Sequence, residues 1–217
     1  MNSDLSVSMP MKIGILGGTG RMGGGLADSY ARRGHEVFLG SRSPDQARAV
    51  ALGIEGEVRG GSLLETARDS DLLVVAVPFE VAEELIRSLA DLLTDKIVVD
   101  ITNPFGAITP GRIAAVEVHA NAVPSAHWVA AYKTTFWKTL GQPADSAGVT
   151  RDVLVCSDDR PAGQTVMDLI ASTGFRPIDC GSLENARAVD LMVPLMLELD
   201  ERYQCECASG WKFLAAH

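Results

Sequence analysis

The sequence contains few of the residues that build metal centres or disulfide frameworks. It has only four cysteines and four histidines among 217 residues. Cys205 and Cys207 are separated by one residue, which is not a common zinc-ligand spacing, and His119 and His127 lie far away in sequence. We therefore expect free thiols, as in a reducing compartment, and no metal site.

Long apolar runs and excess positive charge are also absent. No stretch of about 18 apolar residues occurs, so no membrane-spanning helix is predicted. Residues 1–10 are polar, lack a signal-peptide core and are expected to form a disordered tail. The formal net charge of -9 argues against nucleic acid or an anionic membrane as a partner. A cytoplasmic protein with a small-molecule substrate is the expectation.

What the sequence does contain is a glycine-rich turn near its start. The apolar segment Lys12–Leu16 runs into Gly18, Gly20 and Gly23, which have the spacing G-x-G-x-x-G, and a helical pattern follows. In a dinucleotide-binding turn, the first glycine permits the tight bend, the second admits a pyrophosphate and the third allows close packing. Phosphates then sit at the helix N-terminus. The alternative is a turn that binds nothing. The expected cofactor-binding residues of this turn are Gly18, Thr19, Gly20, Arg21, Met22 and Gly23.

Strands and helices alternate along the first two thirds of the chain. The run at residues 72–77, after Asp71, is continuously apolar, as expected for a strand buried on both faces of a parallel sheet. Alternation of this kind predicts an α/β fold with a doubly wound parallel sheet, a Rossmann domain, over residues 11–145. Beyond a stretch rich in Gly, Pro, Ala and Asp, residues 146–217 are expected to form a small C-terminal α/β subdomain that ends in a long helix.

The tip of the second strand indicates which dinucleotide binds. NAD-binding proteins place Asp or Glu there for the ribose 2′-hydroxyl, whereas this chain has Gly40-Ser41-Arg42. A hydroxyl and a guanidinium suit a 2′-phosphate, because arginine offers a fork of donors to its oxygens. The sequence therefore favours NADP(H), held by Ser41 and Arg42 with help from Thr19. Otherwise Ser41 and Arg42 are ordinary turn and surface residues.

Later strand ends are expected beside the nicotinamide, because ligands of open α/β sheets bind at the carboxyl ends of the strands. The candidates there are Ala76, Val77, Pro78, Asn103, Pro104 and Ala131. The chain then continues into a polar segment that we expect to face the hydride acceptor, with Tyr132, Lys133, Thr134 and Thr135. Lys133 could attract an anionic acceptor or polarise a carbonyl. The alternative is a polar loop that merely covers the end of the sheet.

Several segments together resemble the F420-dependent NADP oxidoreductases, over about the whole chain after the tail. The N-terminal resemblance lies in Ile15-Leu16-Gly17-Gly18-Thr19-Gly20, Gly34-His35-Glu36-Val37, Leu39-Gly40-Ser41-Arg42, Ala76-Val77-Pro78 and Lys96-Ile97-Val98-Val99. More specific to the family is Arg176-Pro177-Ile178-Asp179-Cys180-Gly181-Ser182-Leu183-Glu184-Asn185-Ala186-Arg187, followed by Trp211-Lys212-Phe213-Leu214.

The resemblance implies direct hydride transfer between NADP(H) and the deazaflavin coenzyme F420. Such transfer needs no catalytic acid or base of its own, since rate comes from proximity and orientation. The resemblance also assigns the 2′-phosphate to Thr19, Ser41 and Arg42, with Gln46 in place of a family lysine. Lys133-Thr134-Thr135-Phe136 departs from the family's histidine and isoleucine-proline. A flavin, carbonyl or imine acceptor, or a non-catalytic NADP sensor, therefore remains an alternative.

The resemblance further implies a homodimer. The expected long C-terminal helix carries a row of apolar residues: Leu191, Met192, Leu195, Met196 and Leu199. Such a face suits a subunit interface, and the alternative is that it covers the sheet within one chain.

Overall fold

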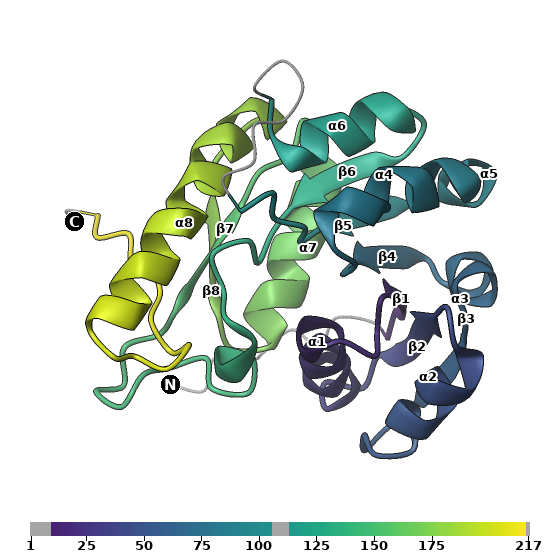
Figure 1. Ribbon diagram of the computed structural model, residues 1–217, viewed down its shortest axis with the longest axis horizontal. Helices are drawn as coiled ribbons and strands as arrows, with labels where there is room; N and C mark the ends of the chain where they lie inside the picture. Colours follow the sequence, from purple (N-terminus) through teal and green to yellow (C-terminus); the bar gives the residue numbers. More distant parts are fainter. Residues whose placement is uncertain (1–9, 106–112, 216–217) are drawn as a thin grey trace, which may run out of the picture.

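The structure is a computed structural model that describes residues 10–105 and 113–215 (Figure 1). Six parallel strands form the main sheet in the order β3-β2-β1-β4-β5-β6. Their bounds are β1 (Lys12–Leu16), β2 (Glu36–Ser41), β3 (Val58–Ser62), β4 (Leu72–Val75), β5 (Ile97–Asp100) and β6 (His127–Ala130). The predicted doubly wound parallel sheet is confirmed. Nearly all of the predicted tail lies outside the described residues.

Helices cover both faces of this sheet, as Figure 1 shows. On one face α1, α2 and α7 share a core, and on the other α3, α4, α5, α6 and the start of α8 do so. The bounds are α1 (Arg21–Ala31), α2 (Pro44–Ala51), α3 (Leu63–Asp69), α4 (Phe79–Ser88), α5 (Ala90–Leu93), α6 (Ala115–Ala122), α7 (Arg160–Ser172) and α8 (Ala186–Arg202).

The continuous apolar strands supply both cores, because alternate side chains point to opposite faces. Ile13, Ile15 and Val74 pack beneath α1 and α7, whereas Leu73 and Val75 pack beneath α3 and α4. The strand order reverses between β1 and β4, and such a switch point opens a crevice outside the carboxyl ends of the strands.

The C-terminal part adds a two-stranded parallel sheet, β7 (Asp152–Val155) and β8 (Arg176–Asp179). Ala130 and Cys156 exchange two backbone hydrogen bonds of 2.9 and 3.0 Å, which join β7 to the end of β6. Val153, Val166 and Ile170 belong to the same core as α1 and β1, so the hydrophobic core runs across the predicted boundary. The division at residue 145 stays a prediction.

Within the described parts of the chain, every helix is too short or too polar to cross a membrane. The long helix α8 is present as predicted and lies beside the carboxyl edge of the main sheet (Figure 1). It contacts α6, and the chain beyond it folds back onto β7, where Phe213 N donates to Asp152 at 2.8 Å.

Candidate active site

The turn after β1 needs glycine at two positions for reasons of backbone geometry. Gly17 has a φ of +93°, and a Cβ there would lie 2.6 Å from the carbonyl oxygen of Ala76. A Cβ on Gly23 would lie 2.6 Å from the Gly17 carbonyl oxygen. Gly18 instead avoids the side chain of Leu39, at 2.7 Å. The tight bend therefore belongs to Gly17 and not to Gly18, whereas close packing belongs to Gly23 as expected.

Gly20 differs from its neighbours because its open side faces no protein atoms at close range. A Cβ there would have Gly17 O as its nearest contact, at 3.4 Å, and its φ of -79° is accessible to any residue. It is the N-cap of α1, whose first turn carries no acidic residue. Backbone N–H groups and the positive end of a helix dipole therefore adjoin empty space, which is the arrangement that holds a pyrophosphate.

A cleft of about 890 Å³, open to solvent, lies over this turn. Its walls come from the glycine turn, the tip of β2, the end of β4 and the exposed side of α4. The lining residues are Gly17, Thr19, Gly20, Ser41, Arg42, Ser43, Gln46, Leu63, Ala76, Val77, Pro78, Val81, Glu84, Leu85 and Ser88. The structure thus brings together the predicted pyrophosphate turn, the predicted 2′-phosphate residues and one of the predicted nicotinamide walls.

The tip of β2 presents the groups expected for a 2′-phosphate. Arg42 is exposed, and its guanidinium makes no hydrogen bond or ion pair with any other described residue. Ser41 is almost buried, and its Oγ accepts a hydrogen bond of 3.1 Å from Ser43 N. A free guanidinium next to a fixed hydroxyl fits a dianionic phosphate, and the strand tip lacks the carboxylate that would accept a hydrogen bond from a ribose 2′-hydroxyl.

Other predicted cofactor residues lie outside this cleft. Arg21 places its guanidinium 5.1 Å from the ring centroid of Trp137 at the rim, and Met22 packs against the core. Pro104 and Ala131 are buried. Asn103 is half-buried, and its Nδ2 donates to the Lys133 carbonyl oxygen at 3.2 Å.

The acceptor segment differs from the prediction at its first two residues. Tyr132 is 2% exposed, and Tyr30 donates a hydrogen bond of 3.3 Å to its hydroxyl from α1. Burial raises the pKa of Tyr132 to about 12. Tyr132 has a φ of 55°, in the left-handed region that a bulky residue occupies only when its surroundings hold it there. This bend breaks the alternation of β6, so the Tyr132 phenol points into the core.

Lys133 also turns inward, which corrects the expectation that its ammonium faces the acceptor. Its side chain is 1% exposed, and Nζ donates to the Thr102 carbonyl oxygen at 2.6 Å. Nζ lies 3.1 Å from Asp190 Oδ1 and 3.8 Å from Asp100 Oδ1. The positive charge of Lys133, which the sequence suggested for attracting an acceptor, is instead paired with the buried carboxylates of Asp100 and Asp190.

Thr134 and Thr135 follow this bend. Thr134 is buried and Thr135 half-buried, and both line a separate cavity of about 100 Å³. Its other walls include Phe175 and Trp211 from the C-terminal part. These threonines lie at the junction of the two sheets and not on the cofactor cleft.

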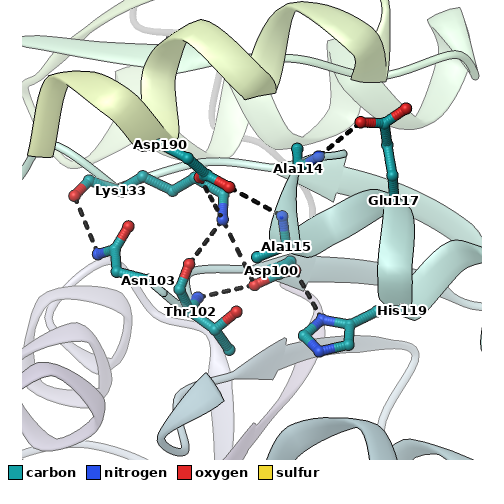
Figure 2. Close-up of polar contacts among 9 residues, drawn as sticks. All are labelled: Asp100, Thr102, Asn103, Ala114, Ala115, Glu117, His119, Lys133 and Asp190. Atoms are coloured by element: carbon teal, nitrogen blue, oxygen red, sulfur yellow. Dashed lines mark hydrogen bonds and ion pairs between the residues drawn. The ribbon is translucent and has the colours of Figure 1, made fainter. Parts of the chain in front are cut away.

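Figure 2 shows the buried cluster that surrounds Lys133. Asp100 Oδ2 lies 2.8 Å from His119 Nδ1, and both side chains are fully buried. Burial opposes ionisation of Asp100, but Lys133, His119 and the Thr102 N–H together hold the pKa of Asp100 at about 2. Asp190 differs, because its burial outweighs the Lys133 charge and raises its pKa.

Asp100, His119 and Asp190 are not among the site residues that the sequence patterns predict. Two signals were present: Asp100 ends the otherwise apolar strand β5, and Asp190 interrupts an apolar stretch of α8. Across residues 10–105 and 113–215, no group of three or more His, Cys, Asp or Glu side chains could hold a metal ion.

Comparisons with known proteins identify the family of the chain. The family described as NADP oxidoreductase, coenzyme F420-dependent, matches residues 12–104. The F420-dependent NADP reductase of Methanocaldococcus jannaschii is 31% identical over 216 residues, covering 89% of this chain and 94% of that protein. The corresponding reductase of Methanothermobacter thermautotrophicus is 32% identical and covers 89% of this chain and 91% of that protein.

Solved structures extend the likeness. A candidate F420-dependent NADP reductase from Arthrobacter sp. FB24 superposes with a TM-score of 0.79 and 27% identity, over 89% of this chain and 95% of that one. An imine reductase from Streptomyces aurantiacus, at 15% identity and a TM-score of 0.66 over 90% of this chain and 63% of that one, shares the fold alone. The chain belongs to the family of F420-dependent NADP reductases.

Proposed function

We propose that the protein is an NADPH:F420 oxidoreductase that transfers a hydride between NADP(H) and the deazaflavin ring of F420. The observation that carries the proposal is the cleft over Gly20 and Arg42, which offers N–H groups and a helix N-terminus for a pyrophosphate and an unpaired guanidinium for a 2′-phosphate. Family membership over 89% of the chain supplies F420 as the acceptor.

Each end of the cleft would fix one part of the dinucleotide. The open backbone at Gly20 and the first turn of α1 hold the pyrophosphate, while Arg42 and Ser41 hold the 2′-phosphate. Ala76, Val77 and Pro78 at the end of β4 then give the nicotinamide an apolar wall. NADPH supplies the hydride, and solvent supplies the proton that F420 reduction also consumes. The chain's own task is therefore to hold two rings in contact and to exclude water between them.

The direct experiment supplies the protein with NADPH that carries deuterium at C4 of the nicotinamide. F420, FMN and a small cyclic imine are offered as separate acceptors, and NADPH oxidation is followed. We expect oxidation with F420 and deuterium in the reduced deazaflavin. Oxidation with FMN or the imine alone would refute the F420 assignment, and tight NADPH binding without turnover would identify a sensor. Gly20→Val is the matched variant that should abolish turnover with every acceptor.

We also propose that the protein works as a homodimer in a reducing cytoplasm. Leu191 and Leu195 on α8 are 73% and 48% exposed, which is unusual for neighbouring large apolar residues on one helix. All four cysteines are free, as expected in a reducing compartment. Light scattering should give the mass of two chains, and Leu191→Glu should shift it to one. A wild-type protein that is monomeric at high concentration would rule out the dimer.

A further inference from the structure

Asp190 is the carboxylate through which α8 reaches the carboxyl edge of the main sheet (Figure 2). Its side chain is 8% exposed, and Oδ2 accepts a hydrogen bond of 2.8 Å from the backbone N–H of Ala115 at the start of α6. Its Oδ1 lies 3.1 Å from Lys133 Nζ. One side chain of the C-terminal helix thus contacts both α6 and the segment after β6.

Lys133 connects Asp190 to the segment that follows β5. Its Nζ donates to the Thr102 carbonyl oxygen at 2.6 Å, and its own carbonyl oxygen accepts from Asn103 Nδ2 at 3.2 Å. Asp100 Oδ1 accepts from Thr102 N at 2.7 Å. The segments after β5 and β6 are therefore tied to each other at several points, and Asp190 ties both to α8.

These two segments follow the strand ends next to the one that leads into the cofactor cleft. β5 pairs with β4, and β4 leads into Ala76, Val77 and Pro78, which line the cofactor cleft. β6 is the next strand outward. Ligands of open parallel sheets lie outside such carboxyl ends, and residues 102–103 and 133–135 follow the two strand ends next to β4, outside the cofactor cleft itself.

Stability alone gives a weak reason for this cluster. A buried ion pair is commonly no more stabilising than apolar side chains of the same volume, because desolvation offsets the attraction. An apolar side chain at position 133 would fill the space, but it could not donate a hydrogen bond to the Thr102 carbonyl oxygen or form an ion pair with Asp190. The hydrogen bonds and ion pairs of the charged groups are directional, so they favour one arrangement of the two segments.

We propose that Asp190 is a positioning residue for the hydride acceptor. Acting through Lys133, it holds residues 102–103 and 133–135 in the arrangement that lets the F420 ring lie against the nicotinamide, and it touches neither ring itself. The inference rests on the proposed function for the identity of the acceptor, whereas the anchoring of the two segments can be tested without any acceptor.

The chain offers a matched control on the same pair of helices. Arg187 of α8 donates two hydrogen bonds of 2.8 and 2.7 Å to Glu117 of α6. Glu117 in turn accepts from Ala114 N at 2.6 Å. This pair links α8 to α6 as Asp190 does, but among the described residues neither side chain hydrogen-bonds or ion-pairs with Lys133 or the end of β5. Arg187→Gln therefore loosens the helix pair and leaves the acceptor segments anchored.

The experiment compares Asp190→Asn, Lys133→Met, Arg187→Gln and the double variant Asp190→Asn with Lys133→Met. Amide hydrogen exchange at residues 102–103 and 133–135, melting temperature, NADPH affinity and steady-state kinetics with F420 are measured on the whole chain. For Asp190→Asn we expect faster exchange in both segments and a kcat/KM for F420 lowered about 10- to 100-fold, with NADPH affinity unchanged. Arg187→Gln should leave the exchange and the kinetics as in the wild type.

The double variant separates positioning from mere stability. It removes the charges of Asp190 and Lys133 together but leaves Asp100 without its ammonium partner. We therefore expect a melting temperature above that of Lys133→Met alone, while kcat/KM for F420 stays low and exchange stays fast. Recovery of the kinetics with the melting temperature, or unchanged exchange in Asp190→Asn, would overturn the proposal. A wild-type protein that does not reduce F420 would instead refute the proposed function. The exchange comparison would then decide the role of Asp190 without an acceptor.

Discussion

The two halves of the site are built in opposite ways. The cofactor half is open, and the groups proposed to hold its phosphates come from one βαβ unit that ends at Arg42. The Lys133 cluster, proposed here to position the acceptor, is closed, and its charged groups come from four segments that are distant in sequence. Asp190 and Ala115 are 75 positions apart, and Lys133 and Thr102 are 31 apart. One half depends on backbone shape, the other on the pairing of buried charges.

This difference predicts different consequences of substitution. An exposed group such as Arg42 can be removed without leaving a buried partner unpaired, so its loss should alter binding and not folding. Lys133 and Asp100 are buried beside each other, so removal of either leaves a charge in a medium of low dielectric constant. Variants on the two sides can therefore be compared by whether stability or affinity changes.

The largest expected effect is on the closed side. Lys133→Met should lower the free energy of unfolding by about 3–5 kcal/mol, because Asp190 and Asp100 lose the ammonium that balances them. Urea unfolding followed by circular dichroism measures this change. Arg42→Ala, the matched variant on the open side, should stay within about 0.5 kcal/mol of the wild type. Similar losses in both variants would remove the contrast between the two halves.

The next effect concerns two glycines only three residues apart. Gly20→Val should fold, because the nearest contact of its Cβ would be 3.4 Å away, but NADPH affinity should fall by more than about 100-fold as the side chain fills the phosphate space. Gly23→Val should fail to fold, since its Cβ would lie 2.6 Å from the Gly17 carbonyl oxygen. Calorimetric titration and melting curves test both. NADPH binding by a folded Gly20→Val variant at wild-type affinity would contradict the phosphate assignment.

The same contrast explains how much could be predicted from the sequence. The sheet and the NADP half follow from patterns within a few dozen residues: apolar strands, glycine spacing and the residues at one strand tip. Lys133 was misplaced because strand alternation extrapolated past β6 does not foresee the left-handed Tyr132. Nor can spacing reveal that Lys133 forms an ion pair with Asp190, which lies 57 positions later in the sequence. Long-range pairing of charges is a tertiary property.

A smaller effect tests cofactor choice on the open side. Arg42→Ala should weaken NADPH binding by about 1–3 kcal/mol, the range for a charged hydrogen-bond partner, and leave NADH binding nearly unchanged. The Arg42 guanidinium makes no hydrogen bond or ion pair with the described residues, so its removal should reduce only the preference for NADPH over NADH. Fluorescence titration with both nucleotides gives the ratio. Arg48→Ala is the control on the same helix region, since Arg48 pairs with Asp45. Equal weakening of both nucleotides by Arg42→Ala would show that Arg42 does not contact the phosphate.

The smallest effect is a pH dependence confined to the closed side. The pKa of Asp100 in the folded chain is about 2, below the ordinary 3.8, so its contribution to stability is full at pH 5 and is lost as the pH falls toward 2. Between pH 5 and pH 3 this loss amounts to about 1 kcal/mol. Asp100→Asn, although less stable throughout, should therefore lose about 1 kcal/mol less over that range than the wild type.

Asp190 should act with the opposite sign and completes that test. Burial raises its pKa, so the folded chain holds a proton on Asp190 more tightly than the unfolded chain, and its contribution grows as the pH falls. Asp190→Asn removes that gain and should make the acid loss steeper than in the wild type. Urea unfolding at pH 5, 4 and 3 gives the three slopes. If both variants changed the slope in the same direction, the two carboxylates could not be ionising differently around Lys133. Asp100 and Asp190 would then share one negative charge, and the cluster would not be a series of distinct contacts from α8 to the strand ends.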